Sequence, residues 1–264
     1  MMTFTTLKFE KNDRVASLTL NRPEIRNAFD TVMIAELTGV FRALATMTDV
    51  SIVVLKGEGK SFCSGADLTY MKEMAGYTLE ENLRDAKALD EMFWTLRHVP
   101  QAVVAKLHGH VMGGALGLTA LCDMAAAVDG TKFCFSENRL GLVPAVISPY
   151  VLEKMNPGAA RRYMLSAEVF GVWQAADAGL VEFVGGDAEC DEFIATLTKN
   201  LSANGPEAVR TAKKLFRELG ECPEWEDKRE LTTKTISERR VSAEGQEGLK
   251  SFLEKRDPSW KVTT

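Results

Sequence analysis

Two short segments rich in small residues have the composition of turns that expose backbone N–H groups. They run from Phe62 to Leu68, with the sequence FCSGADL, and from His108 to Gly114, with the sequence HGHVMGG. Each follows an apolar run and precedes a stretch with helical periodicity. A strand that enters a helix through small residues leaves unpaired N–H groups at the positive end of the helix dipole. Two such turns side by side could direct two donors at one carbonyl oxygen, which predicts an oxyanion hole suited to thioester chemistry.

The elements that must position these turns are predicted by apolar periodicity. The expected strands in the first half of the chain cover residues 15–20, 51–55, 102–107 and 124–128. The expected helices there cover residues 30–47, 79–99 and 113–122, the first of them capped by Asp30. Strand, turn and helix thus recur in order without a sequence repeat.

From residue 149 onward helical patterns predominate. They cover residues 166–180, 189–203, 206–219 and 224–255, and strand signals are confined to residues 181–184. Periodicity alone therefore predicts an α/β core followed by helices.

The composition excludes several classes of function. The chain has 264 residues, of which 45% are hydrophobic, so a full core can form. A net charge of −5 without a lysine-rich run argues against nucleic acid as a partner. The five cysteines and three histidines show no metal-ligand or disulfide spacing, so we expect reduced thiols in the cytoplasm and no bound metal. We find no leader pattern and no apolar stretch long enough to cross a membrane.

The two glycine-containing segments resemble the paired oxyanion-hole motifs of the crotonase superfamily, which comprises the enoyl-CoA hydratases and isomerases. Three further stretches, at residues 21–28, 137–144 and 248–258, resemble the same family in the same order. The resemblance implies an α/β fold with a crotonase-like ββα spiral core over residues 1–200. It implies a helical C-terminal oligomerisation region over residues 201–264, and an acyl-CoA-binding homo-trimer or dimer of trimers.

The resemblance also assigns site residues. The N–H groups of Ala66 and Gly114 are the expected oxyanion donors, and Glu137 matches the glutamate that exchanges a proton with the α-carbon or with water. Apolar neighbours in the sequence of Glu137 are expected to raise its pKa. Phe252 and Lys255 are expected to reach the site of a neighbouring subunit. The full set of residues expected to contact coenzyme A is Arg26, Ala28, Ser64, Asp67, Leu68, Gly113, Phe252 and Lys255.

One position departs from the family pattern. Hydratases of the superfamily usually carry a second glutamate three residues after the second oxyanion glycine, and this chain has Gly117 there. Because Gly117 has no side chain, Glu137 is the one carboxylate left in the family pattern. A site with one carboxylate favours double-bond isomerisation, or another one-carboxylate reaction, over standard hydration.

A finer resemblance favours hydration. Residues 67–86 and 139–150 resemble the bacterial methylglutaconyl-CoA hydratases, a branch in which glycine also stands at the Gly117 position. Substrates of that branch carry a free carboxylate, for which Arg139 and Tyr77 are conceivable partners.

Three functions therefore stand as hypotheses. The first is hydration of an enoyl-CoA, with a branched or methylglutaconyl-type chain. The second is a Δ3,Δ2-enoyl-CoA isomerase that uses Glu137 alone, and the third is a catalytically silent CoA-binding protein. None of them needs a cofactor, because coenzyme A is part of the substrate.

Overall fold

A computed structural model describes residues 4–261, and its main sheet is the element from which the predicted turns leave. β1 is antiparallel to β2, and every other neighbouring pair in this sheet is parallel. The strands in spatial order are β1 (Leu7–Asn12), β2 (Val15–Leu20), β3 (Ile52–Gly57), β4 (Ala102–Leu107), β6 (Met124–Val128) and β9 (Phe183–Gly185).

A smaller sheet lies beyond the ends of these strands. Its central strand, β7, is parallel to β5 and antiparallel to β8. The three strands are β5 (His110–Met112), β7 (Lys132–Cys134) and β8 (Phe170–Gly171).

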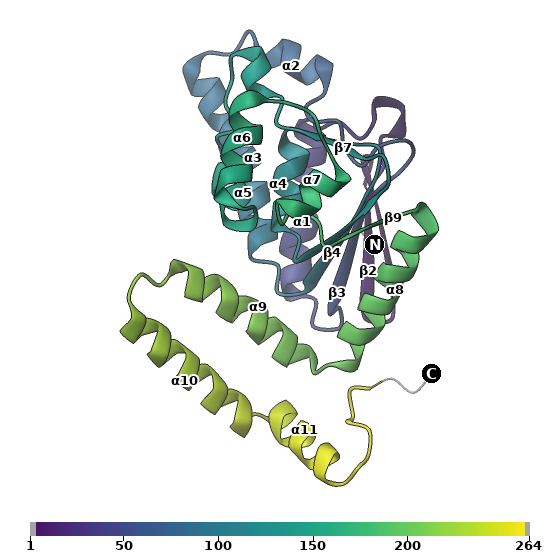
Figure 1. The fold of residues 1–264 in the computed structure, drawn as a ribbon, viewed down its shortest axis with the longest axis vertical. Helices are drawn as coiled ribbons and strands as arrows, with labels where there is room; N and C mark the ends of the chain where they lie inside the picture. The colour runs from purple at the N-terminus through teal and green to yellow at the C-terminus, as the bar shows by residue number, and fades with distance from the viewer. Residues whose placement is uncertain (1–3, 262–264) are drawn as a thin grey trace.

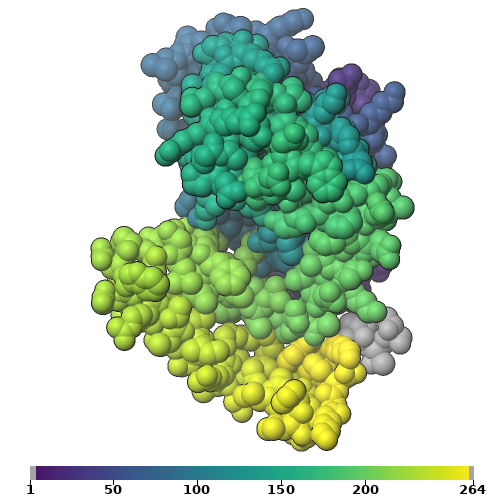
Figure 2. Space-filling model, viewed as in Figure 1, coloured from purple at the N-terminus to yellow at the C-terminus, as the bar shows by residue number. Residues whose placement is uncertain are grey.

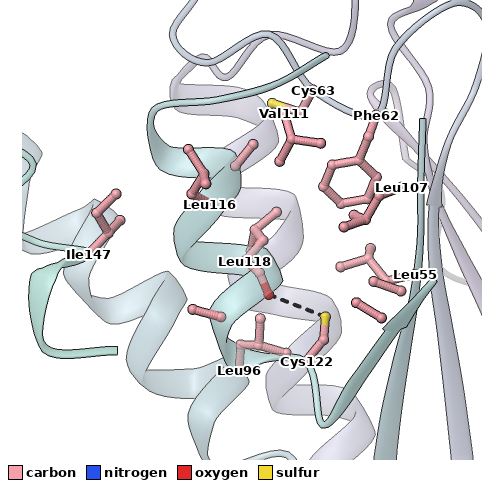
Figure 3. Close-up of a cluster of buried hydrophobic side chains, with 14 of the residues drawn as sticks. Leu55, Phe62, Cys63, Leu96, Leu107, Val111, Leu116, Leu118, Cys122 and Ile147 are labelled. Carbon is pink, nitrogen blue, oxygen red and sulfur yellow. Dashed lines mark hydrogen bonds between the residues drawn. The ribbon is translucent and has the colours of Figure 1, made fainter. Parts of the chain in front are cut away.

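Helices cover both faces of the main sheet (Figure 1), which explains why its inner strands β3, β4 and β6 are largely apolar. On one face, α8 (Asp187–Ala203) packs Cys190 and Ile194 against Ile52 and Val104. The larger core lies on the other face, where Leu118 of α4 lies on the side of the helix that faces Leu55 and Leu107 (Figure 3). The elements associated with this larger core are η1 (Pro23–Ile25), α1 (Thr31–Thr46), α2 (Leu68–Met74), α3 (Leu79–Arg97), α4 (Gly114–Leu121), η2 (Glu137–Leu140), α5 (Ser148–Lys154), α6 (Pro157–Ser166) and α7 (Val172–Asp177).

Three helices extend away from this core: α9 (Pro206–Glu221), α10 (Trp225–Val241) and α11 (Ala243–Leu253). Figure 2 shows them as a separate lower part of the molecule. α9 is tied to the core by long cationic side chains, since Arg210 donates to the carbonyl of Val50 at 2.7 Å and Lys213 donates to Asp123 at 2.7 Å. α10 and α11 pack on α9 and on each other.

The fold is the α/β crotonase-like spiral with a helical C-terminal region that the sequence predicts. Asp30 caps α1 as expected, accepting a hydrogen bond from the Met33 N–H at 2.8 Å. The boundary at residue 200 between the spiral core and the C-terminal region stays a prediction. In the structure, α8 is joined to α9 by Asn204 and Gly205. Within residues 4–261, no helix combines the length and apolarity that a bilayer crossing requires.

Two helix predictions were wrong. The expected helix over 166–180 is interrupted because Phe170 pairs with Phe133 in the small sheet, so β8 replaces its middle and only α7 follows. The expected helix over 224–255 breaks at Ser242, whose hydroxyl caps α11 by accepting a hydrogen bond from the Gly245 N–H at 3.0 Å.

Two backbone segments approach each other closely at Gly109, which has a φ of +63°. A Cβ atom there would lie 2.0 Å from the carbonyl oxygen of Lys60. Gly130 offers a matched comparison, because its φ is +80° but nothing lies within 4 Å of an added Cβ.

We predict that Gly109→Ala destabilises the protein by about 1–3 kcal/mol more than Gly130→Ala does, because only the former adds a backbone clash to the left-handed strain. Urea unfolding of the two variants measures the difference. Equal losses of stability would contradict the close approach.

Candidate active site

The two glycine-containing segments run side by side. The Phe62 N–H donates to the His108 carbonyl at 2.8 Å, and the Cys63 N–H donates to the His110 carbonyl at 3.1 Å. The Met112 N–H returns a bond of 3.1 Å to the Cys63 carbonyl. These bonds fix the first turn against the second, as the sequence predicts.

In each turn, the N–H group of the expected oxyanion donor has no partner among the described residues. The backbone around Ala66 pairs with Phe29 on both sides, through Phe29 N–H to the Gly65 carbonyl at 2.7 Å and Asp67 N–H to the Phe29 carbonyl at 2.8 Å. The Ala66 N–H is not part of this pairing. Gly114 is the first residue of α4, so its N–H has no intrahelical acceptor. Within residues 4–261, neither N–H donates a hydrogen bond.

Both residues line one cavity of about 390 Å³. Its walls are mostly apolar and come from the two turns, from α1, α2 and α3, and from the segment that runs from η2 into α5. A largely apolar cavity lined by two residues with unpaired backbone N–H groups is suited to polarise a carbonyl group on an otherwise apolar chain.

Glu137 lies in the same cavity. Its carboxylate is close to the second turn, because a Cβ atom on Gly113 would lie 3.3 Å from Oε1 of Glu137. Oε2 of Glu137 is buried and has no hydrogen-bond partner among the described residues. This burial raises the pKa of Glu137 above its ordinary value of 4.5. Glu137 therefore has the position and the environment of a general acid or base.

Gly117 lies on α4 next to Ile147, which lines the cavity. The space in front of Gly117 is already filled by other side chains. A Cβ atom at Gly117 would lie 2.4 Å from Cγ2 of Ile147 and 2.8 Å from Cε1 of Phe93. Figure 3 shows Ile147 on the side of α4 that faces away from the strands. The space that a second carboxylate would need is thus occupied by two apolar side chains.

A second polar pair lies in the wall formed by α2 and α3. The hydroxyl of Tyr70, which is 6% exposed, donates to Oδ1 of Asp85 at 2.5 Å. Burial, and then the bond to Asp85, raise the pKa of Tyr70. Asp85 and Glu137 are the charged side chains among the cavity-lining residues, and no lysine, arginine or histidine is among them.

The structure brings only some of the other predicted residues to the cavity. Ser64, Leu68 and Gly113 line it. Arg26 and Ala28 lie nearby in the chain path, since the Arg26 carbonyl accepts a 3.0 Å bond from the Ser64 N–H, but neither is a lining residue.

Asp67 and the C-terminal residues have other surroundings. The Asp67 carboxylate caps α2 through the Thr69 N–H at 2.7 Å and accepts a bond from Arg22 at 3.2 Å, which is a structural use. Phe252 and Lys255 are exposed at α11, at the opposite end of the molecule from α2 (Figure 1). Their expected coenzyme A contacts stay predictions, and so do those of the other residues.

Sequence reasoning missed several lining residues. Phe29, Tyr70, Asp85 and Ile147 reach the cavity from separate elements, and no spacing connects them. Ser136 could have been found, because it directly precedes Glu137. Arg139 and Tyr77 are not lining residues, and the Arg139 guanidinium instead donates to the Ala167 carbonyl at 2.5 Å.

Comparisons with known proteins agree with this fold. Residues 10–263 match the family model described as Enoyl-CoA hydratase/isomerase. The chain is 29% identical to 2,3-dehydroadipyl-CoA hydratase of Escherichia coli, over 95% of this chain and 96% of that protein. An enoyl-CoA hydratase structure from Shewanella pealeana has a TM-score of 0.93 at 38% identity, covering 97% of this chain and 96% of the other.

A second solved structure is described as a putative enoyl-CoA hydratase/isomerase (crotonase) from Legionella pneumophila. It has a TM-score of 0.90 at 40% identity and covers 98% of this chain and 100% of its own. The fold and the paired turns define a crotonase-type protein. The chain belongs to the enoyl-CoA hydratase/isomerase family.

The raised pKa of Glu137 predicts a pH dependence. If Glu137 acts as a base it must be ionised, so the turnover rate should fall as the pH is lowered through a pKa above 4.5. The pH profile of kcat/KM measures this value, because it reports the groups of the free enzyme. An acidic limb at or below 4.5 would contradict the assignment.

Proposed function

We propose that this protein adds water to the double bond of an enoyl-CoA. The observation that supports the proposal is the cavity that Ala66, Gly114 and Glu137 all line, since the N–H groups of the first two have no acceptor and Oε2 of Glu137 is buried without a partner among the described residues. A thioester carbonyl supplies an acceptor for the donors, and its α,β-double bond would lie within the same apolar walls.

The reaction then follows from the positions of these groups. The thioester oxygen accepts hydrogen bonds from the Ala66 and Gly114 N–H groups, which stabilise the negative charge that develops on it. Glu137 takes a proton from water while the water oxygen bonds to the β-carbon and the π electrons move toward the α-carbon and the thioester oxygen. Glu137 then returns the proton to the α-carbon. Atoms and charge balance without a metal or a redox cofactor.

A second candidate is Δ3,Δ2-enoyl-CoA isomerisation, and the filled position beside Gly117 favours it. Glu137 would remove a proton from one carbon and deliver it to another, so a single carboxylate suffices. Crotonyl-CoA separates the two activities, because only a hydratase removes the absorbance of its conjugated thioester. The catalytically silent alternative predicts acyl-CoA binding without turnover of either substrate type.

The acyl chain is a finer part of the proposal. The apolar lining, together with the absence of a basic residue from the cavity-lining set, supports a branched, uncharged chain. A methylglutaconyl-type chain is supported by the resemblance at residues 67–86 and 139–150. It is also supported by the relative from Escherichia coli, whose name specifies 2,3-dehydroadipyl-CoA. Comparing the turnover rate of 3-methylglutaconyl-CoA with that of an uncharged branched enoyl-CoA distinguishes these two kinds of acyl chain.

We also propose that the protein is a homo-trimer or a dimer of trimers in the cytoplasm. Free cysteines among the described residues are compatible with that compartment. Support for assembly comes from large apolar side chains exposed on the three C-terminal helices, which are Phe216, Trp225, Ile236, Val241, Leu249, Phe252 and Leu253.

The assembly prediction is tested by mass measurement in solution. Light scattering on the purified protein should give three or six times the 29.1 kDa chain mass. Replacing the exposed Phe252 and Leu253 by polar residues should shift the mass toward smaller species, because these side chains would lose a covered apolar environment. A monomeric parent protein would contradict the proposal.

For Glu137→Gln we predict a loss in turnover on the order of 100- to 10,000-fold, because glutamine cannot transfer a proton at neutral pH. Acyl-CoA binding should be nearly unchanged. Thermal stability at pH 7 should be equal or higher. The raised pKa means that ionised Glu137 lowers the stability of the folded state above that pKa, and glutamine removes the buried charge.

Steady-state kinetics, calorimetric binding and thermal unfolding of this variant test the three parts separately. Turnover within a few-fold of the parent would show that Glu137 is not the proton-transfer group.

A further inference from the structure

The Ser136 hydroxyl lies in the cavity directly before Glu137 in the chain. The same point in space, the Cβ position on Gly113, lies 3.8 Å from Oγ of Ser136 and 3.3 Å from Oε1 of Glu137. The hydroxyl therefore flanks the second oxyanion turn, together with the carboxylate.

No group in the part of the chain that the structure describes bonds to this hydroxyl. Ser136 precedes η2 at its N-cap position without making a side-chain capping bond. Within residues 4–261 its Oγ makes no hydrogen bond to another group, whereas the other cavity serine, Ser64, donates its Oγ hydrogen to the Ile25 carbonyl at 3.4 Å. Ser136 is thus an available hydroxyl next to an available carboxylate.

Hydration by one carboxylate leaves a positioning problem. A water molecule that gives one hydrogen to Glu137 has a second hydrogen, which needs an acceptor if the oxygen lone pair is to point at the β-carbon. The position from which a second glutamate would act, Gly117, is blocked by Ile147 and Phe93. The other polar pair of the cavity is already engaged, because Tyr70 and Asp85 bond to each other.

We infer that the Ser136 hydroxyl holds the attacking water together with Glu137 and so takes the role of the missing second carboxylate. This inference rests on the proposed hydratase function. Oγ of Ser136 accepts the hydrogen of water that stays on the product, and Glu137 accepts the hydrogen that is transferred. The bond that breaks is the O–H bond facing Glu137, and the bond that forms joins the water oxygen to the β-carbon. Ser136 gives up no proton, so it needs no activated state.

The test compares substitutions of equal shape. Ser136→Thr keeps a hydroxyl and Ser136→Val has the same branched outline without one, while Ser136→Ala removes the group without adding volume. Ser148→Ala is the control, because the Ser148 hydroxyl donates to the Pro144 carbonyl at 2.6 Å and Ser148 is not a cavity-lining residue. The measurements are kcat and KM for enoyl-CoA hydration, the dissociation constant of a saturated acyl-CoA, and the thermal unfolding temperature.

Loss of one neutral hydrogen bond to the water should lower kcat about tenfold in the valine and alanine variants, with KM and saturated acyl-CoA binding unchanged. The threonine variant and the Ser148 control should stay within a few-fold of the parent. An equal loss in threonine and valine would show a steric role and overturn the inference. The inference would also be overturned if kcat were unchanged in the Ser136→Ala and Ser136→Val variants, or if only KM rose in them.

Failure of the proposed function itself looks different. In that case the unaltered protein hydrates no enoyl-CoA of the panel although it binds acyl-CoA, and the inference about Ser136 falls before any variant is compared.

Discussion

The site depends on the contact between the two backbone segments at residues 60–63 and 108–112. Because Gly109 lacks a side chain, the Lys60 carbonyl can approach it closely, and three hydrogen bonds then join the segments. This pairing places the Ala66 turn beside the Gly114 turn, so two unpaired N–H groups share one cavity. Neither β3 nor β4 could achieve this alone, since each strand delivers only one turn. Contact between the turns, and not the chemistry of any side chain, brings Ala66 and Gly114 to the same cavity.

Above the paired segments, the cavity places one carboxylate, that of Glu137, among mostly apolar side chains. Burial of this carboxylate is unfavourable for stability, whereas burial of the apolar side chains is favourable. Oε2 of Glu137 is buried without a partner, which lowers the stability of the folded protein when the group is ionised. The same burial gives the carboxylate a pKa closer to neutral pH, where proton transfer is efficient. Ile147 and Phe93 pack against Gly117, where a second carboxylate would otherwise stand. The burial that makes ionised Glu137 unfavourable for stability is therefore the same burial that suits it to the proposed proton transfer.

Much of the fold and the position of the two turns could be predicted from the sequence, because local chemistry determines them, whereas the assignment of Glu137 came from the family resemblance. Small residues after apolar runs indicated the two turns, and a cap residue marked the start of α1. Phe170 could not be placed correctly, since its pairing with Phe133 overrides a local helical pattern. The contact of Ile147 with Gly117 was equally hidden, because the residues are far apart in sequence and an apolar side chain has no distinctive spacing. Tyr70 and Asp85 likewise meet only through the packing of α2 on α3.

The packing of Ile147 against Gly117 constrains how this site can change during evolution. A Cβ atom at Gly117 would lie 2.4 Å from Ile147, so a glutamate introduced there as a single mutation meets a steric barrier before it can act chemically. A smaller residue at position 147 must come first or arrive together with it. The two positions are therefore epistatic, and the order of substitutions determines whether a lineage can pass between one-acid and two-acid catalysis. An intermediate with a reduced residue 147 and an unchanged Gly117 would carry a cavity and lose stability.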